Sequence, residues 1–486
     1  MKVLFTHSYF YQFDPKQWAD KRPYPPYGTI YAAALLQQKG FECQLHDNNL
    51  RASPSELLES LHSYKPSILV IYDDGFNYLT KMCLTKMREA AYEMIRYGKE
   101  HGCIVIVSSS DSTDHYGEYL SMGADYILLG EGELTLLELV MKMRAFKGNS
   151  RPDILGIAYQ NKEGIVMQNQ RRAVLRTLDE LPDPMWSFVD IEAYKKIWME
   201  HHGYFSLNIA TTRGCPYKCN WCAKPIYGNR YNSRSPQRVV AELKYLHQEY
   251  GANYFWVCDD IFGLKPGWVQ TFRDLVKQAG LKVKYKIQSR VDLLLKEDTI
   301  DALAASGLDT VWVGAESGSQ KILDAMDKGT AVEQIYEATK LLQSKGVKVA
   351  FFLQFGYLGE QMEDIQRTID MLLDSMPDDI GISVSYPLPG TKFYDKEKVQ
   401  LEQKQNWVDS DDLDMMYEAT FSAAFYKRLH RYVHKLFRRK QGFNNLKVIL
   451  RNPSKLFNKK VLRSALLTFY YVPGAILDRY RLQKLN

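Results

Sequence analysis

The sequence predicts an α/β fold in three parts: a doubly wound parallel sheet, a partial (β/α)6 barrel and a helical C-terminal domain. In residues 1–145, short β-rich runs alternate with helical stretches, as in a parallel sheet covered by helices. In residues 203–395, a strand followed by a helix recurs about six times, which favours the partial barrel. Residues 396–486 are helical and basic, and residues 146–202 form a proline-containing linker.

The N-terminal part alternates strands and helices in a regular order. Helices are expected over Thr29–Gln38, ended by Gly40, and over Leu79–Glu100, ended by Gly102. Doubly wound sheets bind ligands beyond the carboxyl ends of their strands, so the loops there are candidate binding segments. The expected strands are Val3–Thr6, Glu42–His46, Ser67–Tyr72, Ile104–Ser108 and Tyr126–Leu129.

The linker and the barrel part carry similar signals. A hairpin is expected from Ile157 to Val166 in the linker. In the barrel part, Ser235 is placed to cap a helix that has Pro236 in its first turn and ends at Gly251. Catalytic groups in barrels gather at the carboxyl ends of the strands. The expected barrel strands are Leu207–Thr212, Tyr254–Cys258, Val283–Gln288, Thr310–Gly314, Val347–Gln354 and Ile380–Val384.

The composition is that of an ordinary globular protein. The 486 residues are 45% hydrophobic and 25% charged, and a net charge of +6 is too small to indicate a nucleic-acid-binding protein by itself. No run of about 18 apolar residues occurs, so no membrane span is expected. The N-terminus lacks the charged and apolar regions of a secretory signal, which makes the protein's expected location cytoplasmic.

Three closely spaced cysteines form the most specific motif. Cys215, Cys219 and Cys222 are separated by three and then two residues. That spacing lets one loop place three thiolates around an iron–sulfur cluster, and three ligands leave one iron open to a small molecule. Zinc normally takes four ligands, and no second close pair of cysteines is present in the sequence. A disulfide is poorly supported, because the total of 7 cysteines is odd and no secretory signal is present.

The C-x3-C-x2-C spacing, with Trp221 directly before the last cysteine, resembles the radical SAM superfamily. The resemblance implies that Cys215, Cys219 and Cys222 ligate a [4Fe-4S] cluster. It also implies that the open iron binds S-adenosylmethionine (AdoMet) and that one electron cleaves it to a 5′-deoxyadenosyl radical. An external electron donor such as flavodoxin or ferredoxin is then required.

Residues 1–145 resemble the Rossmann-like cobalamin-binding domain that precedes the barrel in one class of radical SAM enzymes. Tyr24–Gly28, Ser108–Ser110 and Asp125–Glu133 carry the resemblance. The Asp-x-His-x-x-Gly run that supplies a histidine to cobalt is absent, which implies cobalt with no histidine beneath it. A flavodoxin-like sheet that binds another ligand, or only supports the barrel, is the alternative. The cobalamin-binding residues that the resemblance implies, several of them small enough for close approach to the backbone, are Tyr27, Ser108, Ser109 and Gly130.

By the same resemblance, residues at the carboxyl ends of the barrel strands bind AdoMet. Asp259 and Asp260 end the second strand, where paired acids suit the methionine ammonium; a helix cap and a solvated acid are the alternative. Gln288 and Arg290 end the third strand. The planar guanidinium of Arg290 suits the AdoMet carboxylate or an acidic substrate, and a salt bridge to Asp292 is its alternative.

Two further segments resemble AdoMet-binding regions of the family. Glu316 and Ser317 follow the fourth strand and can hydrogen-bond the ribose and carboxylate of AdoMet, with a capping box as the alternative. Gln354 and Gly356 stand in the region that contacts adenine. Leu358 replaces a proline that this class often has there.

The C-terminal part contains a basic amphipathic stretch, Lys427–Lys440. Such a helix suits peripheral contact with an anionic membrane or a phosphate-bearing substrate, although packing on the chain's own barrel is the commoner case. Residues 464–477 are too short to span a bilayer and apolar enough to cover a hydrophobic active site. The residues that share the apolar face of the basic stretch are Leu429, Val433, Leu436 and Phe437.

The order of the three parts resembles the cobalamin-dependent radical SAM enzymes, in the branch of anaerobic magnesium-protoporphyrin monomethyl ester cyclase and the radical SAM methylases. This implies a methyltransferase acting on an unactivated carbon of a hydrophobic or anionic small molecule or lipid, with the difficult chemistry residing in the cofactors. The second hypothesis is cyclisation, oxidation or carbon–carbon coupling on a tetrapyrrole or lipid without methyl transfer.

A third hypothesis is radical modification of RNA, and two features oppose it. Cys43, Cys83 and Cys103 stand singly instead of forming a second set of cluster ligands. The C-terminal part is predicted to be helical, whereas those enzymes carry a small β-barrel that binds RNA. No nucleic-acid partner is therefore expected. A non-enzymatic cobalamin sensor would not need the cysteine loop, and fold analogy does not choose among possible substrates.

Overall fold

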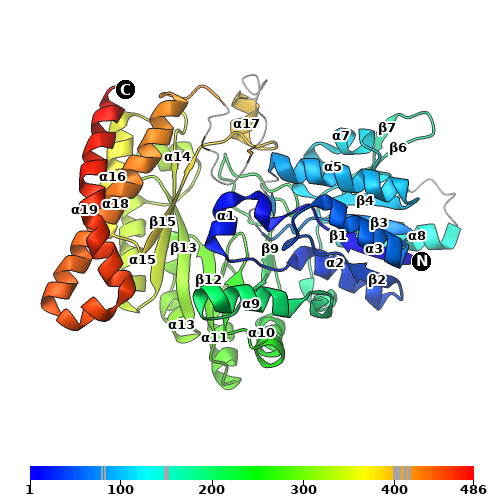
Figure 1. The fold of residues 1–486 in the computed structure, drawn as a ribbon, viewed down its shortest axis with the longest axis horizontal. Helices are drawn as coiled ribbons and strands as arrows, with labels where there is room; N and C mark the ends of the chain where they lie inside the picture. Colours follow the sequence, from blue (N-terminus) through cyan, green and yellow to red (C-terminus); the bar gives the residue numbers. More distant parts are fainter. Residues whose placement is uncertain are drawn as a thin grey trace. The chain divides into compact units, whose positions relative to one another are not determined.

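The computed structural model describes residues 1–77, 80–81, 84–146, 153–397, 407–408, 413 and 417–485 (Figure 1). The chain forms two compact units. The first unit comprises Met1–Pro216, Lys224–Ile287 and Asn406–Asp412, and the second comprises Tyr217–Ala223, Gln288–Gln405 and Leu413–Asn486. The domain boundaries expected from the sequence differ from the limits of these units and stay predictions.

A seven-stranded sheet in the first unit has the order β2-β1-β3-β4-β5-β6-β7. Strands β1 to β5 pair in parallel, and β6 and β7 add an antiparallel hairpin. The parallel order 2-1-3-4-5 is one of the two common doubly wound orders. The strands are β1 (Lys2–Thr6), β2 (Glu42–Leu45), β3 (Ile68–Tyr72), β4 (Ile104–Ser108), β5 (Tyr126–Leu128), β6 (Ile157–Gln160) and β7 (Val166–Gln168).

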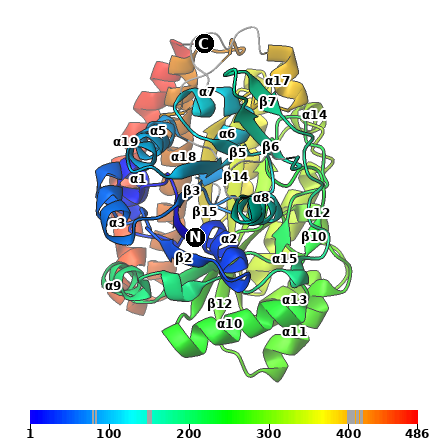
Figure 2. The ribbon, with the colours of Figure 1, turned by 90° about the vertical axis from the view of Figure 1, so that its right-hand side faces the viewer.

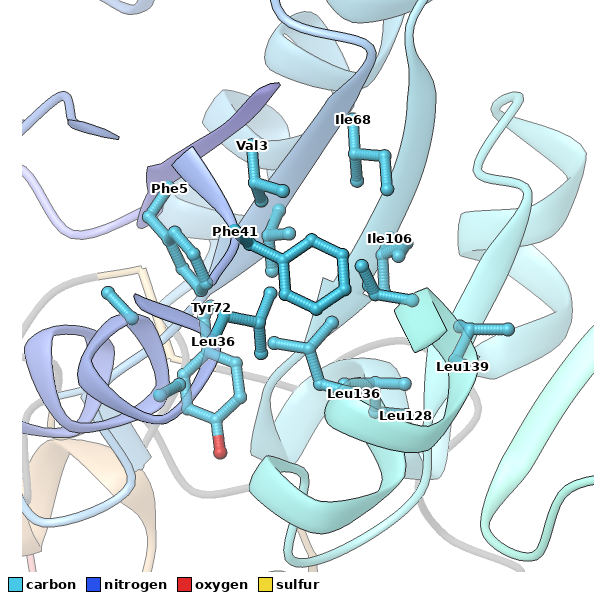
Figure 3. Packing of buried hydrophobic residues seen from close by; sticks show 14 of the residues in the cluster. Val3, Phe5, Leu36, Phe41, Ile68, Tyr72, Ile106, Leu128, Leu136 and Leu139 are labelled. Carbon is cyan, nitrogen blue, oxygen red and sulfur yellow. The ribbon is translucent and has the colours of Figure 1, made fainter. Parts of the chain in front are cut away.

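Helices cover both faces of this sheet, because successive strand residues point to opposite faces. Val3 and Phe5 of β1 pack with α2 (Tyr27–Gln38) and α8 (Glu133–Phe146), as Figure 3 shows. Leu4, between them, belongs to a second cluster with residues of α3 (Leu57–Tyr64) and α5 (Thr85–Glu100). The doubly wound fold predicted for this part of the chain is therefore confirmed.

Two details of the first sheet differ from the expected element limits. The hairpin expected in the linker is present as β6 and β7, and it extends the first sheet instead of standing apart from it. Helix α5 begins at Thr85, whereas the expected helix began at Leu79. Residues 78, 79, 82 and 83, including Cys83, lie outside the described residues.

The strand and helix repeats expected after residue 203 are also present. In the first unit, β11 (Tyr254–Val257) pairs in parallel with β8 (Ser206–Ile209) and with β12 (Lys284–Ser289). In the second unit, β14 (Lys348–Phe355) pairs in parallel with β13 (Leu308–Glu316) and β15 (Asp379–Val384). The helices between these strands are α10 (Pro236–Tyr250), α11 (Trp268–Gln278), α12 (Val291–Leu294), α13 (Thr299–Ala305), α14 (Gln320–Ala325), α15 (Val332–Ser344) and α16 (Met362–Ser375).

Local signals set the ends of α10 as predicted. The Ser235 hydroxyl accepts a hydrogen bond from the backbone N–H of Arg238 at 3.3 Å, and Pro236 is the first helical residue. Gly251 ends the helix with φ +74°, a left-handed conformation that glycine adopts without strain.

The C-terminal part forms two long helices, α18 (Ala423–Arg451) and α19 (Lys459–Gln483), which lie side by side in Figures 1 and 2. The apolar face predicted for residues 427–440 is buried, and α18 contacts α16 and β15. That face therefore packs within the protein, as in the commoner case. Within the described ranges, no helix is long and apolar enough to cross a membrane.

Candidate functional site

Asp259 holds the segment that leads into the cysteine loop. Its Oδ1 accepts hydrogen bonds from the backbone N–H groups of Thr211 at 2.7 Å and Thr212 at 3.0 Å, and its Oδ2 accepts from the Thr211 hydroxyl. The side chain is buried, and burial raises its pKa to about 6 although these hydrogen bonds oppose the shift. Asp259 therefore orients the backbone before Cys215, and its contact with the methionine ammonium stays a prediction.

Arg213, two residues before Cys215, is buried between two carboxylates. One guanidinium nitrogen pairs with Glu131, and another lies 2.8 Å from Glu133 Oε1. Burial opposes the charge, but Glu133 and Glu131 hold the pKa of Arg213 well above its ordinary value. The pairs tie the Gly-Glu-Gly-Glu segment after β5 to the start of the cysteine loop. The rings within 5.5 Å of the guanidinium carbon are Tyr31, Phe76 and Tyr227.

Asn220 anchors the last turn of the cysteine loop. Its backbone N–H donates to the Met326 carbonyl at 3.0 Å, and its Nδ2 donates to the Ala325 carbonyl at 2.6 Å. Its Oδ1 accepts from the Tyr357 hydroxyl at 2.6 Å. Sequence reasoning missed this residue, although its place between Cys219 and Trp221 is a signal that could have identified it.

The three cysteines of the loop are half-buried and form no disulfide. The backbone N–H of Cys222 donates to the Cys219 carbonyl at 3.2 Å, which closes a turn between them. In the part of the chain that the structure describes, no three His, Cys, Asp or Glu side chains are gathered around a metal position. The loop thus supplies three thiols of the right type without converging them.

Arg290, after β12, has one guanidinium nitrogen available. Its Nε donates to Asp292 Oδ1 at 2.9 Å, so the predicted alternative salt bridge is present, and its Nη2 donates to the Gly329 carbonyl at 3.3 Å. The guanidinium carbon lies 3.8 Å from the ring centroid of Tyr217 in the cysteine loop. Nη1 is buried and has no hydrogen-bond partner among the described residues, and the same holds for the hydroxyl of Thr330.

Glu316 has an unusual backbone conformation at the end of β13. Its φ is +56°, in the left-handed region, and a bulge lies between Gly314 and Glu316. A left-handed residue other than glycine costs on the order of 1–3 kcal/mol and is common at functional sites. The carboxylate lies 2.7 Å from Lys328 Nζ, and both side chains are buried. Lys328 was missed by sequence reasoning, because it lies in a loop beyond the recognised motif.

Ser317, the neighbour of Glu316, is used within the protein. Its hydroxyl is 3.0 Å from the Thr368 hydroxyl and accepts from the backbone N–H of Ser319 at 3.1 Å. The side chain is fully buried. Its predicted contact with AdoMet stays a prediction.

The end of β14 combines a buried amide with exposed aromatic surface. Gln354 is buried, and its Oε1 has no hydrogen-bond partner among the described residues. Phe352, two residues earlier and therefore on the same face, stacks on Trp312 with 4.7 Å between ring centroids. Gly356 donates its N–H to Glu360 at 2.7 Å, and burial raises the pKa of Glu360 to about 8.

The small residues predicted to bind cobalamin lie after β4 and β5. Ser108 ends β4, and the Ser109 hydroxyl caps the following helix by accepting from the backbone N–H of Ser112 at 2.8 Å. Gly130 has φ +80°, and a Cβ there would lie 3.3 Å from the Ile226 carbonyl oxygen. A side chain at position 130 would therefore be strained and crowded.

Three further residues predicted to bind cofactors, Tyr27, Asp260 and Gln288, differ in their burial and partners. Tyr27 is buried, and its hydroxyl lies 3.2 Å from Glu242 and 3.1 Å from Arg234. Asp260 pairs with Lys81 at 2.5 Å. Gln288 is half-buried in β12.

Lys286, also in β12, was not predicted. Burial lowers its pKa to about 8, and its ammonium lies 4.9 Å from the Trp256 ring centroid. Its position, two residues before Gln288 in an alternating strand, is the signal that could have identified it.

Residues 209–372 match the family model of the Radical SAM superfamily. The chain is 30% identical over 377 residues to an uncharacterized methyltransferase of Pyrococcus horikoshii. The match covers 76% of this chain and 78% of the relative. It is 26% identical over 423 residues to an anaerobic magnesium-protoporphyrin IX monomethyl ester cyclase of Rubrivivax gelatinosus, covering 84% of this chain and 73% of the relative.

A solved structure extends the likeness to nearly the whole chain. The structure of the cobalamin-dependent S-adenosylmethionine radical enzyme OxsB with aqua-cobalamin bound matches with a TM-score of 0.71 and 18% identity. The match covers 97% of this chain and 72% of that chain. At this identity the likeness concerns the fold, and it confirms the predicted fold class.

Proposed function

The chain belongs to the radical SAM superfamily, and on that premise we propose that it is a cobalamin-dependent methyltransferase acting on an unactivated carbon. The observation that carries the proposal is the loop of Cys215, Cys219 and Cys222 inside the matched residues 209–372. When bound, a [4Fe-4S] cluster, AdoMet and cobalamin supply a one-electron reductant, a hydrogen-abstracting radical and a methyl group.

The cysteine loop is suited to hold the cluster. Its thiols are half-buried, and its two ends are fixed by Asp259 and Asn220. Cysteines bind a metal as thiolates, and formation of a metal site is coupled to binding of the metal. We therefore expect the three thiolates to converge when the cluster binds.

Two buried groups in the second unit support AdoMet binding. Arg290 Nη1 is a cationic donor without a protein partner in the described residues, which suits the AdoMet carboxylate. Gln354 Oε1 is a buried acceptor that also has no hydrogen-bond partner among the described residues, which suits an N–H or O–H of the nucleoside. Burying such groups unpaired is costly, so a polar ligand would stabilise both.

Cobalamin binding is supported by the first sheet. In its doubly wound order, ligands bind beyond the carboxyl ends of the strands. β4 ends at Ser108 and is followed by Ser109, and Gly130 follows β5 with a φ of +80° and the Ile226 carbonyl oxygen 3.3 Å from where a Cβ would lie.

The substrate proposed is a hydrophobic or anionic small molecule or lipid. Phe352 is an exposed large hydrophobic residue on the face of β14 that also carries Gln354. Gly381 of β15 pairs with Phe352 in register, and the rings of Trp312 and Phe352 lie against it, since an added Cβ would be 3.3 Å and 3.4 Å from them. An apolar face of this kind suits apolar substrate surface.

The test is anaerobic reconstitution of the full chain, with iron, sulfide and cobalamin measured per chain and products followed by mass spectrometry. We expect bound cobalamin, with 5′-deoxyadenosine and S-adenosylhomocysteine both formed when substrate is present. The Cys219→Ala variant should lose iron and both products, whereas Cys43→Ala, a buried cysteine on β2, should lose neither. Failure to bind cobalamin would contradict the proposal that the first sheet binds this cofactor.

Cyclisation or oxidation without methyl transfer is a second candidate. It is favoured by the 26% identity to the magnesium-protoporphyrin cyclase over 84% of this chain. Formation of 5′-deoxyadenosine without S-adenosylhomocysteine, in the presence of substrate, would select it over methyl transfer.

A further inference from the structure

Helix α19 turns its large apolar side chains toward solvent. They recur at spacings of three, four and seven residues, which places them in one stripe along the helix. A surface helix of a globular protein normally buries such a stripe. The members of this apolar stripe, each 47–72% exposed, are Leu466, Phe469, Tyr470, Ile476, Leu477 and Tyr480.

The opposite face of α19 is fixed against α18. At Gly442 of α18, an added Cβ would collide with the Thr468 side chain, so the two helices approach closely there. Asp478 is buried and pairs with Arg428 at 2.8 Å and with Lys435 at 2.7 Å. The small and polar residues of the buried face therefore hold the apolar stripe outward.

Helices α18 and α19 form a helical hairpin, the α18–α19 hairpin, and it is strongly cationic. Residues 423–486 contain sixteen Lys and Arg residues and a single acid, Asp478, whereas the rest of the chain holds more acidic than basic residues. Cations stand at both ends of the apolar stripe, and all of them are exposed. They are Lys459 and Arg463 at one end and Arg481 and Lys484 at the other.

The last turn of α18 and the segment between the two helices add exposed apolar surface. Leu450 is 82% exposed and Phe457 is 91% exposed, the highest values among the large hydrophobic residues of the described chain. Arg451 and Lys455 flank them and are exposed as well. Apolar side chains interleaved with cations are the pattern of segments that lie in the headgroup region of a membrane.

We propose that the α18–α19 hairpin binds the surface of an anionic lipid bilayer. The apolar stripe enters the headgroup region, and the surrounding cations pair with lipid phosphates. A second copy of the chain is a poorer occupant, because a self-complementary interface would bring two cationic hairpins together. The proposal is independent of the radical chemistry and goes beyond the proposed function.

The test is sedimentation of the full chain with vesicles of phosphatidylcholine alone or mixed with phosphatidylglycerol. Binding should be about tenfold or more tighter to the anionic vesicles and should weaken with added salt. The double variant Leu466→Gln/Phe469→Gln should lose about tenfold in binding. A matched variant of exposed apolar residues on α15, Tyr336→Gln/Leu341→Gln, should bind as the parent does.

Charge reversal separates the electrostatic part. Lys459→Glu/Arg463→Glu should weaken binding to anionic vesicles and reduce its salt dependence. Circular dichroism of each variant verifies that the helices are retained. Equal binding to both vesicle types, or equal binding by the two apolar double variants, would overturn the proposal.

Light scattering tests the competing occupant. A dimer that dissociates in Leu466→Gln/Phe469→Gln would show that a second copy covers the stripe, and this would also overturn the proposal. Neither measurement requires a cluster or AdoMet, so failure here is distinguishable from failure of the proposed methyl transfer.

Discussion

Replacing Arg213 by methionine should strongly destabilise the protein. The guanidinium pairs with both Glu131 and Glu133, and all three side chains are buried. Without it, two carboxylates remain close together away from water. Removing one partner of a buried ion pair typically costs about 3–5 kcal/mol, because an uncompensated charge is left behind.

The loss should depend on pH and should be reversible by a second change. Burial raises the pKa of Glu131 and Arg213 opposes that shift, so in Arg213→Met this carboxyl binds its proton more tightly in the folded state and stability should rise as pH falls from neutral toward 5. Adding Glu131→Gln and Glu133→Gln removes the charges, and we expect recovery of about 2 kcal/mol or more.

Urea unfolding followed by circular dichroism measures these changes. The matched control is Lys99→Met, whose ammonium lies 2.7 Å from Asp125 in a pair that is partly exposed. An exposed pair contributes about 1 kcal/mol or less. A loss in Arg213→Met no larger than in Lys99→Met, or no recovery in the triple variant, would refute the reasoning.

Three further predictions concern the second unit. Glu360→Gln should remove a pH dependence of stability. Burial raises the pKa of Glu360 in the folded state to about 8, so its contribution to the parent's stability is fully present near pH 4 and is lost as pH rises toward 8, by up to about 1.4 kcal/mol per pH unit. Thermal unfolding across this pH range measures the difference. Asn220→Ala breaks hydrogen bonds to Ala325 and Tyr357 and should cost about 1–3 kcal/mol in urea unfolding and lower the iron bound per chain after reconstitution. Gly442→Ala should cost about 1–3 kcal/mol in thermal unfolding, because the new methyl group meets Thr468.

Each of these predictions has a control or a contradicting outcome. A pH profile unchanged in Glu360→Gln would show that this carboxyl group does not titrate between the two states. Asn444→Ala, at an exposed position of α18, should leave stability and iron content as they are. Gly117→Ala on α7 (Tyr116–Ser121), where nothing lies near the added methyl group, should be neutral or slightly stabilising. Equal effects at Gly442 and Gly117 would contradict the packing argument.

Local sequence signals determined the secondary structure and the cluster loop. The β-rich runs of residues 1–145 and the repeats after residue 203 became strands within a few residues of the expected limits. Ser235 begins α10 and Gly251 ends it, as predicted, because capping depends only on neighbouring atoms. The spacing of the three cysteines is likewise a property of one short loop, so the resemblance to the superfamily could be recognised without coordinates.

The tertiary structure decided what the polar side chains are bonded to. Ser109, Ser317 and Asp259 are candidate ligand contacts by sequence, yet each makes hydrogen bonds within the chain. Asn220 and Lys328 became visible only through partners distant in sequence. Hydrogen bonds of this kind depend on which segments meet in space, and one sequence does not state that.

The C-terminal helices show the same division most clearly. The sequence determined that residues 427–440 and 464–477 are amphipathic or apolar, since side-chain order fixes helical periodicity. It did not determine which apolar face would be covered. Close packing at Gly442 and the ion pairs of Asp478 bury the small-residue face of α19 and leave Phe469 and Tyr470 in solvent, because burial is decided by the neighbouring helix.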